Sequence, residues 1–477
     1  MVPAPSPGRD GDPPAGVGPR SDGRPGPQHL LGLLFDTGSA GPVGGDVPGV
    51  HGARGRIQGR PAYGFCIDPG VRGGAMSRAG CAHIVGVIDA ACREGAPVVG
   101  LWHSGGARID EGVDALDGVG SVFRAMVRAS GVVPQISVVL GPAAGGAAYG
   151  PALTDVVVMA DEGRMFVTGP DVIRQVTGER IGMRDLGGPA VHHEESGVAH
   201  VHARDGDAAV GTARRLVGLL REPDPRDLTL PPDRPALRRA LPERAVRAYD
   251  VRPLLRMLLD DDGLELQADR APNIVTQLGR MGGRTVGLVA NNPIRLGGCL
   301  TARASEKAAR FVRMCDAFGV PVVAVVDVPG YLPGSAEEHG GVLRHGAKLL
   351  HAFAGARTPS VTVVTRKAFG GAYLAMNARS MGAGAVFAWP GAEIAVMGAE
   401  AAVGILHRRT LAETPEAAVP TRRAELVARQ RETTTLDRLV AGGYVDRVID
   451  PAETPARIVE ALDLAPGDRS DQRNIPL

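Results

Sequence analysis

The stretch Gly145-Gly-Ala-Ala-Tyr149 recurs in shortened form as Gly370-Gly-Ala-Tyr373. Each copy follows an apolar run that begins at a proline, Pro134 before the first copy and Pro359 before the second. A glycine pair after such a run is typical of a buried strand that turns directly into a helix. Two copies of one turn indicate two halves of one site.

The repetition extends far beyond these glycines. Matching positions lie 224 residues apart through the middle of each half, 225 apart at the glycine pairs and 229 apart further on. The matched stretches include Pro97-Val-Val99 with Pro321-Val-Val323, Gly73-Gly74 with Gly297-Gly298, and Phe166-Val-Thr-Gly169 with Ala395-Val-Met-Gly398. Self-similarity at a nearly fixed spacing indicates an internal duplication of a domain of roughly 200 residues.

The composition fits a chain with two sizeable cores and no strongly charged partner. Of the 477 residues, 44% are hydrophobic, which suffices for two folded units. The net charge of +1 gives no general attraction to nucleic acid or to a membrane surface. Aromatic residues make up only 4% of the chain, which further disfavours a base-stacking surface.

The cysteines and the N-terminal segment favour a cytoplasmic protein. The five cysteines form no Cys-x-x-Cys pair, so neither a disulfide framework nor a zinc ribbon is indicated. Residues 1–28 are rich in Pro, Gly and Asp and lack the apolar core of a signal peptide, and we interpret them as a disordered tail. No run of about 18 apolar residues occurs, so no membrane span is expected.

Strands that alternate with helices predict an α/β fold. The pattern predicts a strand at 61–68, a helix from Ala82 that ends near Gly95, and a buried strand at 98–102. We place a first domain at 29–225, a Pro-rich linker at 226–248 and a second domain at 249–477. Near the end, the spacing of apolar residues predicts one helix from Ala424 to Leu439.

A glycine pair at the start of a helix can bind an oxygen that becomes negatively charged. The first N–H groups of a helix have no intrahelical partner, and glycine lets an oxygen approach them closely. The positive end of the helix dipole favours negative charge there, as an oxyanion hole requires. The alternative is that each glycine pair only allows the helix to pack tightly on its strand. Two matched pairs suit a reaction in which two carbonyl oxygens carry charge.

The chain resembles the carboxyltransferase (β) subunits of biotin-dependent acyl-CoA carboxylases, most closely the actinobacterial ones that handle propionyl or longer acyl chains. The resemblance covers nearly the whole chain from about residue 50. It rests on these motifs: Ser104-Gly-Gly-Ala-Arg108, Gly141-Pro-Ala-Ala-Gly-Gly-Ala-Ala-Tyr149, Phe166-Val-Thr-Gly-Pro-Asp171, Asn291-Asn-Pro293, Ser305-Glu-Lys-Ala-Ala-Arg-Phe-Val312, Asp327-Val-Pro-Gly330, Arg344-His-Gly-Ala-Lys348, Ala395-Val-Met-Gly398 and the terminal Asn474-Ile-Pro-Leu477.

The resemblance implies two tandem crotonase-like domains of the β-β-α superhelix type in each chain. It also implies transfer of CO2 from carboxybiotin to the α-carbon of an acyl-CoA, for fatty-acid or polyketide extender supply. The thioester oxygen would lie at Gly145 and Gly146, and the ureido oxygen of biotin at Gly371 and Ala372. The implied substrate-binding residues are Ser104, Gly105, Gly106, Ala107, Arg108, Tyr149, Tyr373 and Leu374.

The resemblance further implies the partners. They are a ring-shaped homo-hexamer, in which the first domain of one chain pairs with the second domain of another, and a biotin carboxylase and carrier (α) subunit. None of the three lysines, Lys307, Lys348 and Lys367, lies in a Met-Lys-Met biotinylation context, so biotin belongs on another chain. The alternatives are a subunit of a decarboxylase or transcarboxylase, and a noncatalytic scaffold.

Four further features allow competing interpretations. His192, His193, His200 and His202 cluster in the sequence, but no ligand spacing of the usual kind accompanies them, so no metal is expected. Asp327 precedes a Pro-Gly turn and is expected to stabilise it rather than to catalyse. Arg108 and Lys348 are candidates for CoA phosphate or interface contacts, or for ordinary surface pairing. Leu374 either shapes the acyl pocket or fills the core.

Overall fold

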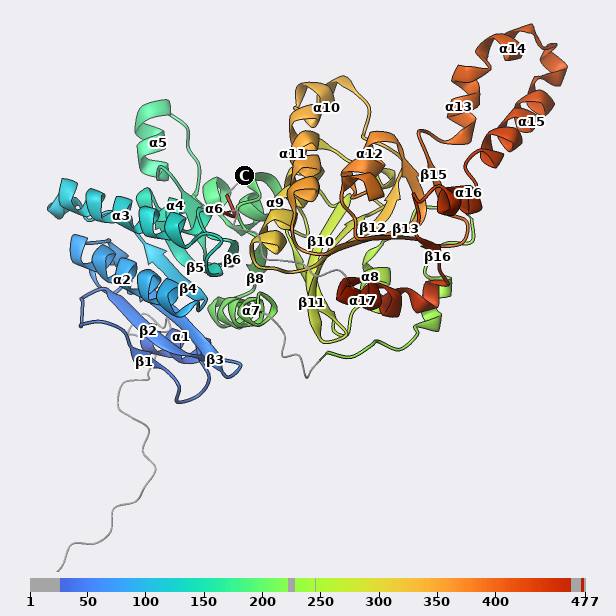
Figure 1. Ribbon diagram of the computed structural model, residues 1–477. Coiled ribbons are helices and arrows are strands. Elements are labelled where there is room, and N and C mark those ends of the chain that lie inside the picture. The colour runs from blue at the N-terminus through green and yellow to red at the C-terminus, as the bar shows by residue number, and fades with distance from the viewer. Residues whose placement is uncertain (1–25, 222–227, 245, 465–472, 476–477) are drawn as a thin grey trace, which may run out of the picture.

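The structure, a computed structural model, describes residues 26–221, 228–244, 246–464 and 473–475. Each half of the chain forms its own eight-stranded sheet, and the two sheets lie side by side, the first half blue to green and the second yellow to red (Figure 1). Helices cover the sheets, as expected for strands with parallel crossovers.

The first sheet has the order β1-β2-β3-β4-β5-β6-β8, with β7 paired to β5. Strands β2 and β3 form an antiparallel hairpin, and from β3 onward neighbouring strands are parallel. The elements are α1 Pro27–Leu34, β1 Gly41–Pro42, β2 Val50–Ile57, β3 Arg60–Ile67, α2 Arg78–Glu94, β4 Val98–Ser104, α3 Val113–Ala129, β5 Gln135–Ala144, α4 Gly146–Ala152, β6 Val156–Ala160, β7 Arg164–Phe166, α5 Pro170–Thr177, α6 Met183–Gly187, β8 Val201–Ala203 and α7 Gly206–Leu219.

The second sheet repeats this topology in the order β9-β10-β11-β12-β13-β14-β16, with β15 paired to β13. The elements are α8 Arg252–Leu258, β9 Leu264–Leu266, β10 Ile274–Met281, β11 Arg284–Asn291, α9 Ala302–Ala317, β12 Val322–Val328, α10 Ser335–His339, α11 Val342–Gly355, β13 Ser360–Phe369, α12 Gly370–Ala375, β14 Ala385–Ala388, β15 Glu393–Ala395, α13 Ala399–Leu406, α14 Arg408–Glu413, α15 Val419–Glu432, α16 Leu436–Ala441, β16 Arg447–Val448 and α17 Thr454–Leu464. Helices α13 to α15 project from the second half as an arm (Figure 1).

Local details confirm the duplication. An isolated bridge joins Met76 to Ala107 in the first half, and a matching bridge joins Leu300 to Tyr331 in the second. A β-bulge interrupts the pairing of β4 with β5 and, at the matching place, that of β12 with β13. The two α/β halves therefore share strand order, connections and irregularities.

The predicted strands and the predicted end of α2 are confirmed, whereas one predicted helix is wrong. The predicted strands at 61–68 and 98–102 are β3 and β4, and α2 ends before Gly95, which adopts the left-handed conformation. The single helix predicted from Ala424 to Leu439 is wrong, because α15 ends at Glu432 and α16 begins at Leu436. Threonines fill the break, and the Thr433 hydroxyl donates to the Gln430 carbonyl at 2.7 Å.

The predicted tail and linker are only partly described. Residues 1–25 lie outside the described residues, and α1 begins at Pro27, within the predicted tail. In the linker, residues 226, 227 and 245 likewise lie outside. The remainder packs on the second half, where Leu237 is buried and Arg238 pairs with Asp450 at 2.7 Å. This part of the linker therefore belongs structurally to the second half.

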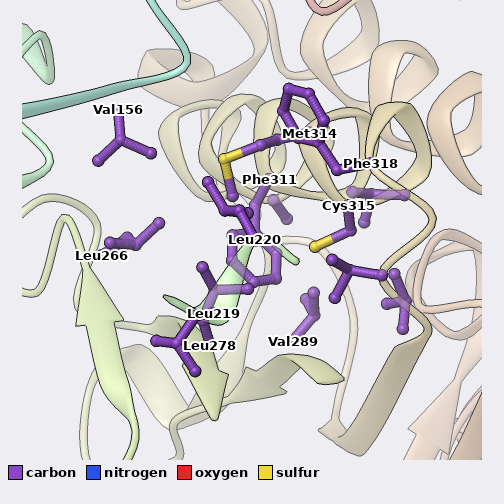
Figure 2. Close-up of a cluster of buried hydrophobic side chains, with 14 of the residues drawn as sticks. Val156, Leu219, Leu220, Leu266, Leu278, Val289, Phe311, Met314, Cys315 and Phe318 are labelled. Carbon is purple, nitrogen blue, oxygen red and sulfur yellow. The ribbon is translucent and has the colours of Figure 1, made fainter. Parts of the chain in front are cut away.

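The largest hydrophobic cluster is shared between the halves. Val156, Leu219 and Leu220 of the first half gather with Leu278, Phe311 and other residues of the second (Figure 2). Among the described residues, four smaller clusters lie within one half each, two in the first half and two in the second. The expectation of two sizeable cores is therefore amended, because the largest core is common to both halves. Among the described residues, none of the helices combines the length and apolarity needed to cross a membrane.

The C-terminal segment also ties the halves together. Asn474 is 1% exposed, and its side-chain amide donates to Asp155 of the first half at 2.7 Å. Its side-chain oxygen accepts from Arg310 of the second half, and its backbone carbonyl accepts from Ser130 at 3.0 Å. The segment lies between the two halves, where the chain end is marked (Figure 1).

We expect Asn474→Ala to lower the free energy of unfolding by about 2–4 kcal/mol, because two charged partners lose buried hydrogen bonds. Urea unfolding at a fixed protein concentration measures this loss. Arg473→Ala is the matched control, because Arg473 has an exposed side chain and contributes its carbonyl to Arg313. Equal stability of the two variants would show that Asn474 does not fasten the halves.

Candidate functional site

Both glycine pairs form a sharp turn from a strand into a helix. Gly145 caps α4 with φ of 56°, and Gly370 starts α12 with φ of 58°. This left-handed conformation is one that residues with a Cβ rarely adopt. The glycines therefore permit a turn at which the N–H groups of the following residues point out of the strand end.

The structure shows which N–H groups already have a partner. Gly145 donates to the Phe166 carbonyl of β7 at 3.1 Å, so the first N–H of this predicted pair is used within the fold. Gly146 is the first residue of α4, where no intrahelical acceptor exists. Gly371 and Ala372 occupy the second and third positions of α12 and are in the same situation.

The loop after β4 lies against the first turn. A Cβ added at Gly106 would lie 3.0 Å from the Ala144 carbonyl, directly before Gly145. The loop is fixed by the Ser104 hydroxyl, which donates to the Gly74 carbonyl at 2.7 Å, and by the Gly105 N–H, which donates to Gly73 at 3.2 Å. The structure thus brings the stretch from Ser104 to Ala107 together with the first glycine pair.

The remaining predicted side chains differ in their surroundings. Arg108 pairs with Asp110 at 3.1 Å and Glu111 at 3.0 Å, and its hydrogen bond to Asp110 raises its pKa. Tyr149 is half exposed and lies edge-on to Phe123. Tyr373 is buried, which raises its pKa to about 12.

Leu374 is 42% exposed, although it belongs to a helix whose neighbouring residues are buried. The interpretation that Leu374 fills the core is therefore wrong, because a core leucine would be covered on all sides. Its side chain stands beside the second turn and is available to a ligand. The interpretation that it shapes the acyl pocket stays a prediction.

A cavity of about 370 Å3 borders the second turn. Phe369, which precedes Gly370, forms part of its wall. The other lining residues come from the segment 391–399, which contains β15, and from the segment 430–437, where α15 ends and α16 begins. A space of this size lies within the usual range for small-molecule sites. The cavity therefore adjoins the end of β13, while the residues of the second turn itself do not line it.

The four histidines that cluster in the sequence have different partners in the structure. The ring of His192 bonds to Ser196 and to the Met165 carbonyl, both at 2.7 Å. His193 pairs with Asp269 at 3.0 Å, and His202 with Asp161 at 3.4 Å. His200 accepts from the Val157 N–H, and burial lowers its pKa to about 3. Within the described ranges, no group of three His, Cys, Asp or Glu side chains could hold a metal ion.

Asp327 has a role that the sequence did not reveal. Its carboxylate is buried and pairs with Arg366 Nε at 2.8 Å, and it also accepts from the Lys367 N–H at 3.3 Å. The Arg366 guanidinium lies over the Tyr249 ring at 5.1 Å. Burial raises the pKa of Asp327, although Arg366 opposes this change. The expected turn-stabilising residue is thus one partner of a buried ion pair.

The internal repeat of the sequence contains a hint that Asp327 and Arg366 have a special role. At the positions that match Asp327 and Arg366, the first half has His103 and Gly141. A comparison of the two halves of the sequence shows that a carboxylate and a guanidinium occur together in the second half alone. Their contact could not be inferred, because it depends on the bulge between β12 and β13.

Comparison with known proteins identifies what the chain is similar to. The model of the carboxyl transferase domain family matches residues 46–473. The chain is 54% identical to the biotin-dependent acetyl-/propionyl-coenzyme A carboxylase beta6 subunit of Mycobacterium tuberculosis, over 97% of this chain and 99% of the relative. It is 55% identical to the propionyl-CoA carboxylase beta chain of Rhodococcus erythropolis, over 94% and 96%.

The solved structures agree. The chain superposes on the hexameric transcarboxylase 12S subunit, solved with methylmalonyl-coenzyme A and methylmalonic acid bound, with a TM-score of 0.89. The two sequences are 41% identical, and the alignment covers 95% of this chain and 92% of the other.

Proposed function

The chain belongs to the carboxyl transferase family and is the carboxyltransferase subunit of an acyl-CoA carboxylase, and on this basis we propose how its two halves divide the reaction. The first half binds the acyl-CoA thioester, and the second half binds the biotin of a separate carrier. The observation that carries this division is the matched pair of glycine turns, each with helix-start N–H groups beside a strand end.

In the first half, the thioester oxygen of the acyl-CoA is the atom that gains negative charge during the reaction. The N–H of Gly146, with that of Ala147, stabilises negative charge on this oxygen as the α-carbon becomes nucleophilic. We prefer these two donors to Gly145 and Gly146, because Gly145 already donates to Phe166. The adjacent loop from Ser104 to Ala107 lines the approach to this turn.

In the second half, Gly371 and Ala372 are the residues that would hold the ureido oxygen of biotin. The fit is good, because a Cβ at Gly371 would find no protein atom within 4 Å, so an oxygen can approach the N–H donors. Carboxybiotin, when bound, supplies the carboxyl group. Neither half needs a side-chain nucleophile for this chemistry.

The proposed partners follow from the surface around the turns. Val167 and Val396 lie beside the first and second turns at matching positions, and both are exposed. Ile109, between β4 and α3, and Ile405 on the arm are exposed as well. Apolar residues around a site favour cover by another subunit. We therefore propose that the first half of one chain faces the second half of another within a hexamer, as in the hexameric relative.

The biotin carboxylase and carrier subunit is the second proposed partner, in the cytoplasm. The preferred acyl group is propionyl or longer, and supply of extender units for fatty acids or polyketides remains a prediction. Identity to carboxylase β subunits exceeds that to the transcarboxylase, so bicarbonate rather than a keto acid is the proposed carboxyl source.

We expect this chain, mixed with its biotinylated partner, ATP and labelled bicarbonate, to carboxylate propionyl-CoA and butyryl-CoA faster than acetyl-CoA. The measurement is label incorporation across a series of acyl-CoA lengths. Transfer only from a carboxylated CoA to a keto acid would indicate a transcarboxylase. Assembly of the complex without any transfer would indicate a scaffold and would contradict the proposed division of the site.

A further inference from the structure

The pairing of β12 with β13 breaks directly before the second glycine turn. Val326 lies opposite Val364 and Val328 opposite Ala368, so Asp327 faces the three residues 365–367. Beyond this bulge, β12 leads to Gly330 and β13 leads to Gly370. The spacing between these two ends therefore depends on how the bulge is held.

Side chains hold the bulge where the backbone ladder is missing. The Asp327 carboxylate accepts from the Lys367 N–H and pairs with Arg366, and the Thr365 hydroxyl donates to the Val326 carbonyl at 3.1 Å. Arg366 is fixed in turn, because it donates to the Arg247 carbonyl at 2.9 Å and covers Tyr249. The side chains of Asp327 and Arg366 are 3% and 12% exposed.

The first half contains the same bulge with different residues. Trp102 lies opposite Val139 and Ser104 opposite Ala143, with His103 at the centre. A Cβ on Gly141 would lie 2.4 Å from the His103 ring, so the imidazole occupies the space beside this glycine. The backbone shape can therefore be kept without an ion pair, and the pair is a specific feature of the second half.

We propose that Asp327 and Arg366 are positioning residues for the biotin-side turn: the ion pair sets the distance between the Gly330 loop and the N–H groups of Gly371 and Ala372. This inference rests on the proposed function, in which the second half binds biotin. Positioning matters because a donor displaced by a fraction of an ångström stabilises charge poorly. The effect of losing the pair should appear on the biotin side of the reaction alone.

The test compares Asp327→Asn with His103→Asn, the change at the matching position of the first half. Asparagine keeps the size of aspartate and an acceptor for the Lys367 N–H, but it removes the charge opposite Arg366. The assay runs the transfer in reverse, from a carboxylated acyl-CoA as carboxyl donor to free biotin as acceptor. In Asp327→Asn, we expect kcat to fall at least tenfold and KM for free biotin to rise several-fold, while KM for the carboxylated acyl-CoA stays within twofold. In His103→Asn, the change in KM should fall on the carboxylated acyl-CoA instead.

Arg366→Lys serves as the second variant if Asp327→Asn does not fold. Lysine keeps the charge but lacks the planar group that covers Tyr249, so the same pattern of kinetic changes is expected. Unchanged kcat in a folded variant, or an equal rise in both KM values, would overturn the inference. The outcome is separable from that of the proposed function, because Gly371→Val tests the biotin site itself.

Discussion

Gly371→Val is expected to lower the rate of carboxyl transfer at least a hundredfold in a protein that still folds and assembles. A Cβ at this position meets no protein atom within 4 Å, and the φ of Gly371 lies outside the left-handed region, so the backbone accepts a residue with a Cβ here. Its branched side chain stands instead where an oxygen must reach the N–H donors. Loss of one such donor typically costs roughly 10²–10³-fold in rate.

The measurement is label incorporation with the biotinylated partner, together with size-exclusion chromatography of the complex. Gly211→Val is the matched control, because Gly211 is an exposed residue of α7 at which a Cβ likewise meets nothing within 4 Å. Gly146→Val should also inactivate, but its Cβ would approach Val119 at 3.0 Å, so local repacking complicates that variant. More than about a tenth of normal activity in Gly371→Val would place the biotin oxygen elsewhere.

The duplication could be predicted because it is recorded in glycines and prolines, whose effect on the backbone does not depend on distant contacts. Glycine and proline restrict the backbone by their own geometry, so their spacing survives when other side chains diverge. Gly145 and Gly370 have nearly equal φ values, and the bridges of Met76 and Leu300 lie the predicted distance apart. The turn into α4 and the end of α2 followed from the same kind of signal.

Other features depend on which distant segments meet, and the sequence could not supply them. The N–H of Gly145 is taken by Phe166, a residue of β7 that comes after the turn in the chain. The common core forms because α7 of the first half contacts β10 of the second, and Leu219 and Leu220 at its end are buried among residues of β10 and α9 (Figure 2). The pairing of Asp327 with Arg366 requires the bulge that brings their strands into a new register.

Leu374→Asp is expected to abolish most of the preference for longer acyl chains. The side chain is 42% exposed beside the second turn and presents apolar surface without charge. Burial of one methylene contributes about 0.8 kcal/mol, so the two extra methylenes of butyryl-CoA correspond to roughly 10- to 15-fold in kcat/KM over acetyl-CoA. An aspartate replaces this surface with a hydrated carboxylate, against which an acyl tail gains nothing.

The quantity to measure is the ratio of kcat/KM for butyryl-CoA to that for acetyl-CoA. We expect this ratio to fall about tenfold in Leu374→Asp and to change little in Leu374→Met, which keeps an apolar side chain of similar volume. An equal loss for every chain length would mean that Leu374 supports the turn instead of contacting the tail. Since the side chain is already exposed, its replacement costs little packing, and a change confined to the longer substrates identifies direct contact.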